Sequence, residues 1–128
     1  MIEHEKIKEL FQELLVQPKK LFPKEGYDYE ASKEKGVYVI LKGLKVLHVG
    51  CTPRARKGIG QRLRNHLQGK SSFVRKFLKG NPSELRQGCS FQYLAVEDSR
   101  QRMLLESYAV GILCPEHLGV GLRFNGVR

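Results

Sequence analysis

Hydrophobic residues recur at helical spacing at the start of the chain. The apolar positions follow one another at mostly three- and four-residue steps, at Ile2, Ile7, Leu10, Phe11, Leu14 and Leu15. This spacing predicts an amphipathic helix over residues 2–15, which Pro18 ends or closely follows. Residues 16–35 contain two prolines, a glycine and mixed charges, which indicate a connector. Tyr27 and Tyr29 in this connector could form a short strand or pack on the core.

Two short β-branched and aromatic runs come next, at residues 37–41 and 45–50. A turn at Lys42-Gly43-Leu44 separates them, so we predict a β-hairpin. A basic, glycine-containing loop follows. Ile59, Leu63 and Leu67 then predict a helix that ends near Gly69.

The second half of the chain carries three further elements. Ser71 or Ser72 could cap a helix over residues 73–78, which Gly80-Asn81-Pro82 would stop. Residues 89–96 alternate in the manner of a third strand, and residues 100–113 form a helix with Ser99 as its N-cap and Pro115 beyond its end. The order predicts an α+β fold, a small sheet with helices packed on it.

Length and composition limit the class of protein. With 128 residues, 41% of them hydrophobic, the chain suits about one domain. No apolar run approaches the ~20 residues of a membrane span, and no signal-peptide pattern is present, so we expect no membrane association. Three cysteines at unrelated spacings, without a CxxC pair, argue against a structural zinc site and favour reduced thiols in the cytoplasm.

Positive charge is concentrated in the middle of the chain. Lys and Arg number 23 against 13 Asp and Glu, a net charge of +10, and no acidic residue lies between Glu34 and Glu84. That interval contains Lys35, Lys42, Lys45, Arg54, Arg56, Lys57, Arg62, Arg64, Lys70, Arg75, Lys76 and Lys79. A single-sign interval favours a polyanionic partner such as nucleic acid, although a basic surface without a specific partner is the alternative.

A few polar residues stand inside apolar segments. Glu106 shares a helical row with Met103, Val110 and Leu113, where a carboxylate is costly unless a cation meets it. It could instead lie at the stripe edge and pair with a structural arginine. Arg62 and His66, four residues apart, point the same way from one helix and could bind phosphate or move a proton, or could belong to a solvated basic face.

These residues together resemble the GIY-YIG nuclease family. Gly36-Val37-Tyr38 stands for the first family triplet and His48-Val49-Gly50 for the second, followed by Arg62, His66 and Glu106. The resemblance covers residues 36–125 and implies a three-stranded antiparallel sheet flanked by helices, with residues 1–35 as an added N-terminal helix and connector before a single globular unit at 36–128. Two features depart from the family. His48 replaces the second tyrosine, and the connection from Gly50 to Arg62 is longer than in compact members.

The resemblance implies an endonuclease that hydrolyses phosphodiester bonds, with DNA as the expected substrate and RNA as the open alternative. It also implies one Mg²⁺ or Mn²⁺ held by Glu106 and a role in repair or restriction. Its catalytic set would be Tyr38, His48, Arg62, His66 and Glu106. At an ordinary pKa of ~6.5, His48 would titrate near neutral pH. The expected nucleic-acid-binding residues are Arg54, Arg56, Lys57, Arg64, Lys70, Arg75, Lys76, Lys79 and Asn125, although Asn125 before Gly126 could be a simple turn residue.

Three alternatives remain open. The same fold could be a catalytically degenerate module that only binds nucleic acid, and convergence of Tyr38, Arg62 and Glu106 would argue against that. It could act on RNA, although few aromatics are evident beside the basic residues, which weakly disfavours single-strand stacking. It could be an interaction protein whose N-terminal helix docks a partner.

Overall fold

The chain folds into an α+β arrangement, as predicted. The computed structural model describes residues 2–24, 33–52 and 58–118. Within these ranges the elements are α1 (Glu3–Leu15), β1 (Lys20–Leu21), β2 (Gly36–Lys42), β3 (Lys45–Cys51), α2 (Gly58–Leu67), the π-helix η1 (Phe73–Phe77), the 3-10 helix η2 (Pro82–Arg86), β4 (Cys89–Ala95) and α3 (Ser99–Leu113).

The sheet has four strands rather than the predicted three. Its order is β1-β4-β2-β3, and every neighbouring pair is antiparallel. The hairpin of β2 and β3 is confirmed. The additional strand, β1, lies in the predicted connector and pairs Lys20 with Phe91 and Leu21 with Ser90. Two residues are too short to show a period-2 pattern, so only pairing with β4 identifies this strand. Tyr27 and Tyr29 lie outside the described residues.

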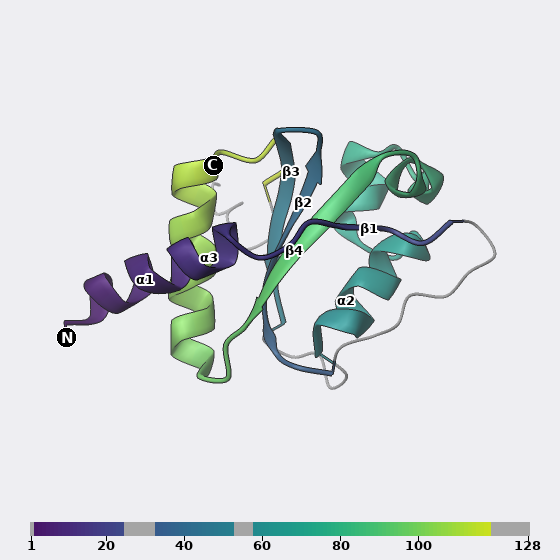
Figure 1. Cartoon of the computed structure of the whole chain (residues 1–128). Coiled ribbons are helices and arrows are strands. Elements are labelled where there is room, and N and C mark those ends of the chain that lie inside the picture. The colour runs from purple at the N-terminus through teal and green to yellow at the C-terminus, as the bar shows by residue number, and fades with distance from the viewer. Residues whose placement is uncertain (1, 25–32, 53–57, 119–128) are drawn as a thin grey trace, which may run out of the picture.

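Helices cover both faces of the sheet (Figure 1). α1 and α3 lie against one face, and α2, η1 and η2 lie against the other. β2 is a central strand, so its apolar residues are buried on both sides: Val37 and Val39 face the α1/α3 layer, while Tyr38 and Ile40 face the α2 layer. Burial on both faces explains why this strand is a nearly continuous hydrophobic run.

A β-bulge changes the direction of side chains in β3. Ile40 pairs with His48 but the next residue, Leu41, pairs with Val46, which leaves Leu47 as the additional residue. Leu47 and His48 therefore both pack in the α2 layer, whereas Val46 and Val49 pack in the α1/α3 layer. Bulges of this kind commonly re-aim side chains at sheet edges and beside functional sites.

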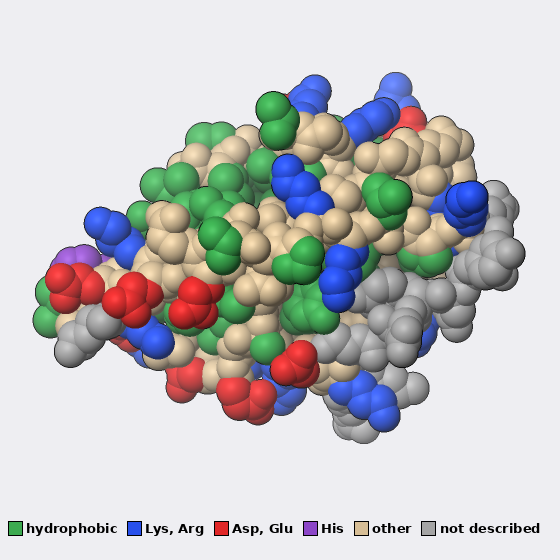
Figure 2. Space-filling view, viewed as in Figure 1, with side chains coloured by type: hydrophobic (Ala, Val, Ile, Leu, Met, Phe, Trp, Pro, Cys, Tyr) green, Lys and Arg blue, Asp and Glu red, His purple; other side chains and the backbone are tan. Residues whose placement is uncertain are grey.

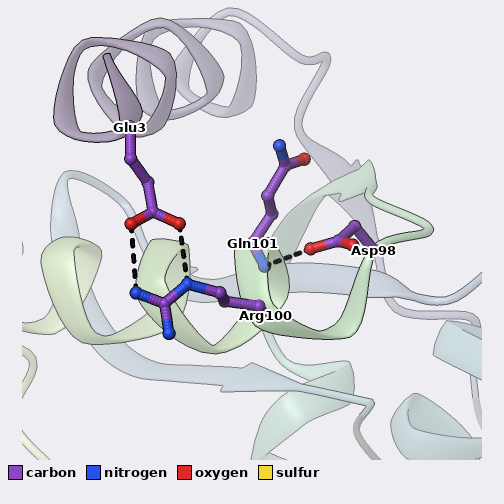
Figure 3. Close-up of polar contacts among 4 residues, drawn as sticks. All are labelled: Glu3, Asp98, Arg100 and Gln101. Carbon is purple, nitrogen blue, oxygen red and sulfur yellow. Dashed lines mark hydrogen bonds and ion pairs between the residues drawn. The ribbon is translucent and has the colours of Figure 1, made fainter.

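The predicted N-terminal helix packs on its own chain. Its buried residues Ile7, Leu10, Phe11 and Leu14 belong to the core that α3 and the sheet also build. Figure 3 shows Glu3 of α1 in a two-bond ion pair with Arg100 of α3, at 2.7 and 3.0 Å. Because its apolar face is already covered, α1 offers no motive for docking a partner.

One predicted helix cap is wrong and another is confirmed. The N-cap of α3 is Asp98 rather than Ser99, and its carboxylate accepts a hydrogen bond from the Gln101 amide (Figure 3). The predicted helix at residues 73–78 is a short π-helix, and the buried Ser71 hydroxyl caps it as predicted by accepting from the Val74 amide.

Candidate functional site

Gly36 and Gly50 allow two close contacts in the sheet that a larger residue would prevent. Tyr38 pairs with Gly50 across the hairpin, and a Cβ added to Gly50 would lie 2.5 Å from Tyr38 Cζ. A side chain at Gly36 would overlap the backbone carbonyl of Leu94 on β4. These contacts explain why both predicted triplets contain glycine. Gly50 leaves room for the Tyr38 ring against β3, and Gly36 lets β4 approach β2 closely.

The Tyr38 hydroxyl begins a buried chain of hydrogen bonds. It lies 2.7 Å from His66 Nε2 on α2, and His66 Nδ1 lies 2.6 Å from Ser71 Oγ. Tyr38 and His66 are fully buried. Burial, together with the nearby His48 and Arg62, holds the pKa of His66 well below its usual range. His66 is therefore a neutral imidazole, with one nitrogen donating and the other accepting.

His48 is part of an aromatic cluster rather than an open surface. Its ring stacks on Phe73 at 4.7 Å between centroids, and its Nδ1 lies 3.2 Å from Nδ1 of His117. The backbone amide of His117 donates to Leu47 O along the outer edge of β3, which fixes this neighbour in place. Burial, with further contributions from His117 and Arg62, lowers the pKa of His48 to about 3. The expectation that His48 titrates near neutral pH is therefore wrong.

Arg62 connects this cluster to Glu106. Burial raises the pKa of Tyr38 to about 12, while the nearby Arg62 guanidinium opposes that rise. The charge of Glu106 raises the same pKa further, so the carboxylate also lies within electrostatic reach. The structure thus brings together side chains from β2, α2 and α3. Arg62 and Glu106 are half-buried, whereas Tyr38 is fully buried.

Glu106 contacts a thiol. Cys51, the residue after the second predicted triplet, donates from Sγ to Glu106 Oε1 at 3.3 Å. Burial, and then the negative charge of Glu106, raises the pKa of Cys51 to about 12, so the thiol keeps its proton. Burial raises the pKa of Glu106, while the Cys51 hydrogen bond and Arg62 lower it. The carboxylate is therefore held between a weak donor and a cation.

Arg102, a buried arginine on the same helix, binds backbone carbonyls rather than Glu106. Arg102 is buried one turn before Glu106, and its guanidinium donates to the carbonyls of Val96 and Glu97 at 3.0 and 2.6 Å. These bonds hold the chain entering α3. The alternative in which Glu106 merely pairs with a structural arginine therefore loses its most obvious partner, because Arg102 is directed to the backbone.

The donor set for a divalent cation is small. No group of three or more His, Cys, Asp or Glu side chains in the described ranges could enclose a metal ion. Glu106 supplies one half-buried carboxylate, and the nearby imidazoles are engaged with Tyr38, Ser71 and with each other. One carboxylate fits a hard cation that retains most of its waters and takes substrate phosphate oxygens, as Mg²⁺ does.

The basic residues predicted to bind nucleic acid fall into two groups. Lys70, Arg75, Lys76 and Lys79 are exposed around the end of α2 and η1, and Arg64 is half-buried. Figure 2 shows carboxylates gathered over α1 and the start of α3 on this face, with mostly Lys and Arg towards the α2 side. Arg54, Arg56, Lys57 and Asn125 lie outside the described residues. No helix in the described ranges is long and apolar enough to cross a membrane.

Sequence reasoning missed three polar residues of this region. His117 is not among the predicted site residues, yet it contacts His48, and Ser71, predicted as a helix cap, also binds His66. Cys51 contacts Glu106 although the two are 55 positions apart. In the sequence, only the position of Cys51 directly after the second triplet, His48-Val49-Gly50, could have indicated that it belongs to this region.

A separate hollow lies elsewhere on the molecule. It has a volume of about 290 Å³, and its lining includes Gln17, Lys20, Glu34 and Tyr93, none of which belongs to the predicted site. Comparison with known protein families, with curated proteins and with solved structures finds no significant match for this chain.

Proposed function

We propose that the protein is a divalent-metal-dependent endonuclease that hydrolyses phosphodiester bonds in DNA at the Tyr38–Arg62–Glu106 site. The observation that carries the proposal is the convergence of these three residues from β2, α2 and α3, with Arg62 close enough to lower the pKa of both Tyr38 and Glu106. The resemblance of the two glycine triplets to GIY-YIG nucleases and the acid-free basic interval support the same function.

Arg62 is the natural phosphate ligand of this group. Its guanidinium is half-buried on α2, beside a hydroxyl and near a carboxylate. A planar guanidinium can donate two hydrogen bonds to one phosphate and offset the charge that grows on the oxygens during attack. Arg62 would therefore orient the scissile phosphate and stabilise the transition state.

Tyr38 and His66 would orient the attacking water. Because His66 is held neutral, its Nε2 can accept a hydrogen bond from the Tyr38 hydroxyl while Nδ1–H donates to Ser71 Oγ. A lone pair of Tyr38 Oη could then accept a hydrogen bond from the water. The raised pKa of Tyr38 and the lowered pKa of His66 make both residues weak bases, so they would position the water rather than take its proton.

Glu106 would hold one Mg²⁺ or Mn²⁺ through its carboxylate. A bound divalent cation would polarise the phosphate and stabilise the leaving oxygen. Cys51 keeps the carboxylate oriented by donating to Oε1, and Arg62 helps to keep it ionised by lowering its pKa. His48 would position its neighbours through the stacked rings, because its low pKa keeps it uncharged at neutral pH.

The second candidate is a module that binds nucleic acid without cutting it. Burial of the Tyr38 hydroxyl favours this function, since a water-activating group must reach the solvent side of the site. The replacement of the family's second tyrosine by a buried His48 favours it as well. Both candidates use the same basic surface, so only cleavage separates them.

The deciding experiment compares cleavage and binding for Glu106→Ala. Nicked, branched and duplex DNAs are incubated with Mg²⁺ or with EDTA, and gel shifts measure affinity. We expect cleavage to fall by at least about a hundredfold, the size typical of losing one transition-state stabilising group, while DNA binding is unchanged or tighter because a negative charge has been removed.

Glu97→Ala is the matched control, since this exposed carboxylate lies just before α3. It should cleave like the unmodified protein. Binding without Mg²⁺-dependent cleavage by the unmodified protein would establish the non-catalytic candidate, and near-normal cleavage by Glu106→Ala would refute the assignment of Glu106.

A further inference from the structure

Three aromatic rings form a column that leads from the surface to the candidate site. Phe77 stacks on Phe73 with centroids 5.5 Å apart and planes 15° from parallel, and Phe73 stacks on His48 at 4.7 Å and 14°. Phe73 and His48 are buried, whereas Phe77 is only half-buried and ends the column at the surface. His117 lies beside it, with ring centroids 6.3 Å apart.

The π-helical turn sets this arrangement. In η1 the wider turn places Phe73 and Phe77 four positions apart with their rings nearly parallel. π-Helical turns are rare and often occur at functional sites. The turn also exposes Arg75 and Lys76 immediately before Phe77. The aromatic end of the column therefore directly follows two exposed cationic residues in η1.

The surface around Phe77 suits a ligand that combines negative charge with planar rings, as nucleic acid does. Lys76 lies close enough to His117 to lower its pKa, although burial is the larger cause. The sequence from Lys35 to Ser83 contributes no carboxylate to this surface. Aromatic side chains beside cations are the common means of binding unpaired bases, because the ring stacks on the base and the cations contact the adjacent phosphates.

We propose that Phe77, with Lys76 and His117, forms a subsite that stacks one unpaired base of the DNA substrate. The subsite would favour single-stranded or branched DNA over intact duplex, in which neighbouring bases cover each base on both sides. This inference rests on the nucleic-acid part of the proposed function and not on cleavage. It also revises the expectation that aromatics are scarce beside the basic residues, since Phe77 follows Arg75-Lys76 directly.

The test uses a single-stranded oligonucleotide that contains 2-aminopurine, in EDTA, so that no cleavage is required. Stacking on an aromatic ring quenches 2-aminopurine fluorescence. The unmodified protein should quench the probe and should bind single-stranded or branched DNA more tightly than duplex of equal length. Phe77→Leu keeps an apolar side chain in η1 but removes the ring, so it should lose the quench and bind single strands about tenfold more weakly.

Two further variants separate stacking from charge and position. Lys76→Ala should weaken binding but retain the quench at saturation. Tyr93→Leu is the matched control, because Tyr93 is also a half-buried aromatic near a lysine, with Lys20 Nζ 5.2 Å from its ring, but lies on β4 away from the column. It should leave both quench and affinity unchanged. Thermal unfolding of each variant verifies that it is folded.

The outcomes distinguish the two proposals. Binding without quench, or equal quench by folded Phe77→Leu, would overturn the stacking subsite and leave the nuclease proposal intact. Equal affinity for duplex and single strand would overturn the preference for unpaired DNA. Absence of binding to every DNA at low salt would overturn the nucleic-acid function itself, and the subsite with it.

Discussion

The two faces of the sheet use the same central strand for different purposes. Towards α1 and α3, β2 presents Val37 and Val39 to an apolar layer. Towards α2, it presents Tyr38 to a layer that also contains buried His48 and His66. Alternate residues of one strand therefore stabilise the fold on one side and build polar chemistry on the other.

The polar face is possible because its members bond to one another. A buried hydroxyl or imidazole without a partner costs free energy, and each unsatisfied group weakens the fold. Tyr38, His66 and Ser71 satisfy each other in sequence, and His48 has His117. The α1/α3 face instead depends on shape and apolar area. We therefore expect the α2 face to be the more sensitive to small chemical changes.

The largest effect is expected from Gly50→Ala, which tests how tightly the α2 face is packed. The new methyl would overlap the Tyr38 ring, so the ring or the β3 backbone must move. We expect a loss of about 3 kcal/mol in the free energy of unfolding. Gly111→Ala is the control on α3, where an added Cβ meets nothing within 4 Å. It should gain up to about 1 kcal/mol from helix propensity. Urea unfolding measures the stability of both variants. Equal changes in the free energy of unfolding would contradict the tighter packing of the α2 face.

A smaller loss is expected from Tyr38→Phe, which removes one hydroxyl from the polar face. His66 Nε2 would lose its 2.7 Å partner, at a cost of about 1–3 kcal/mol. Cleavage should fall steeply, because the hydroxyl would no longer orient the attacking water. Tyr108→Phe is the matched change on the other face, where the half-buried ring packs edge-on against Phe11 at 5.2 Å. If Tyr108→Phe lowered the free energy of unfolding as much as Tyr38→Phe, the hydrogen bonds of the Tyr38 hydroxyl would not explain the loss.

Acid should weaken the α2 face gradually. The unfolded chain protonates His48 near pH 6.5, but the folded chain does so only near pH 3, because burial lowers its pKa. Between these values the unfolded state binds more protons, so stability is full above pH 6.5 and is lost as pH falls. The slope is at most about 1.4 kcal/mol per pH unit for this histidine, and His66 acts in the same direction.

Unfolding curves from pH 7.5 to 5 measure this slope, and folded His48→Phe should show a shallower one. His4→Asn, a change at an exposed residue of α1, should keep the original slope. The acid limb of cleavage should instead follow Glu106, whose pKa burial raises above its ordinary value. A cleavage limb that moves in His48→Phe would show that His48 titrates in the site.

The sequence was sufficient for the local elements. Periodicity placed α1, the β2–β3 hairpin, α2, β4 and α3 within a few residues of their observed bounds, because these segments have strong apolar patterns and glycine or proline at their ends. The resemblance to GIY-YIG nucleases, rather than periodicity, selected Tyr38, Arg62, His66 and Glu106 as a set, and the fold brings these residues near one another. Their chemical roles stay predictions until cleavage is measured.

Tertiary structure decided everything that depends on pairing across long separations. The two-residue β1 exists only because β4 offers a partner, and the bulge at Leu47 directs His48 into the α2 layer. The contacts of Cys51 with Glu106 and of His48 with His117 join residues 55 and 69 positions apart. A side chain's pKa and partners depend on how deeply the surrounding layers bury it. For that reason a histidine expected to titrate near neutral pH is instead a neutral ring stacked on Phe73.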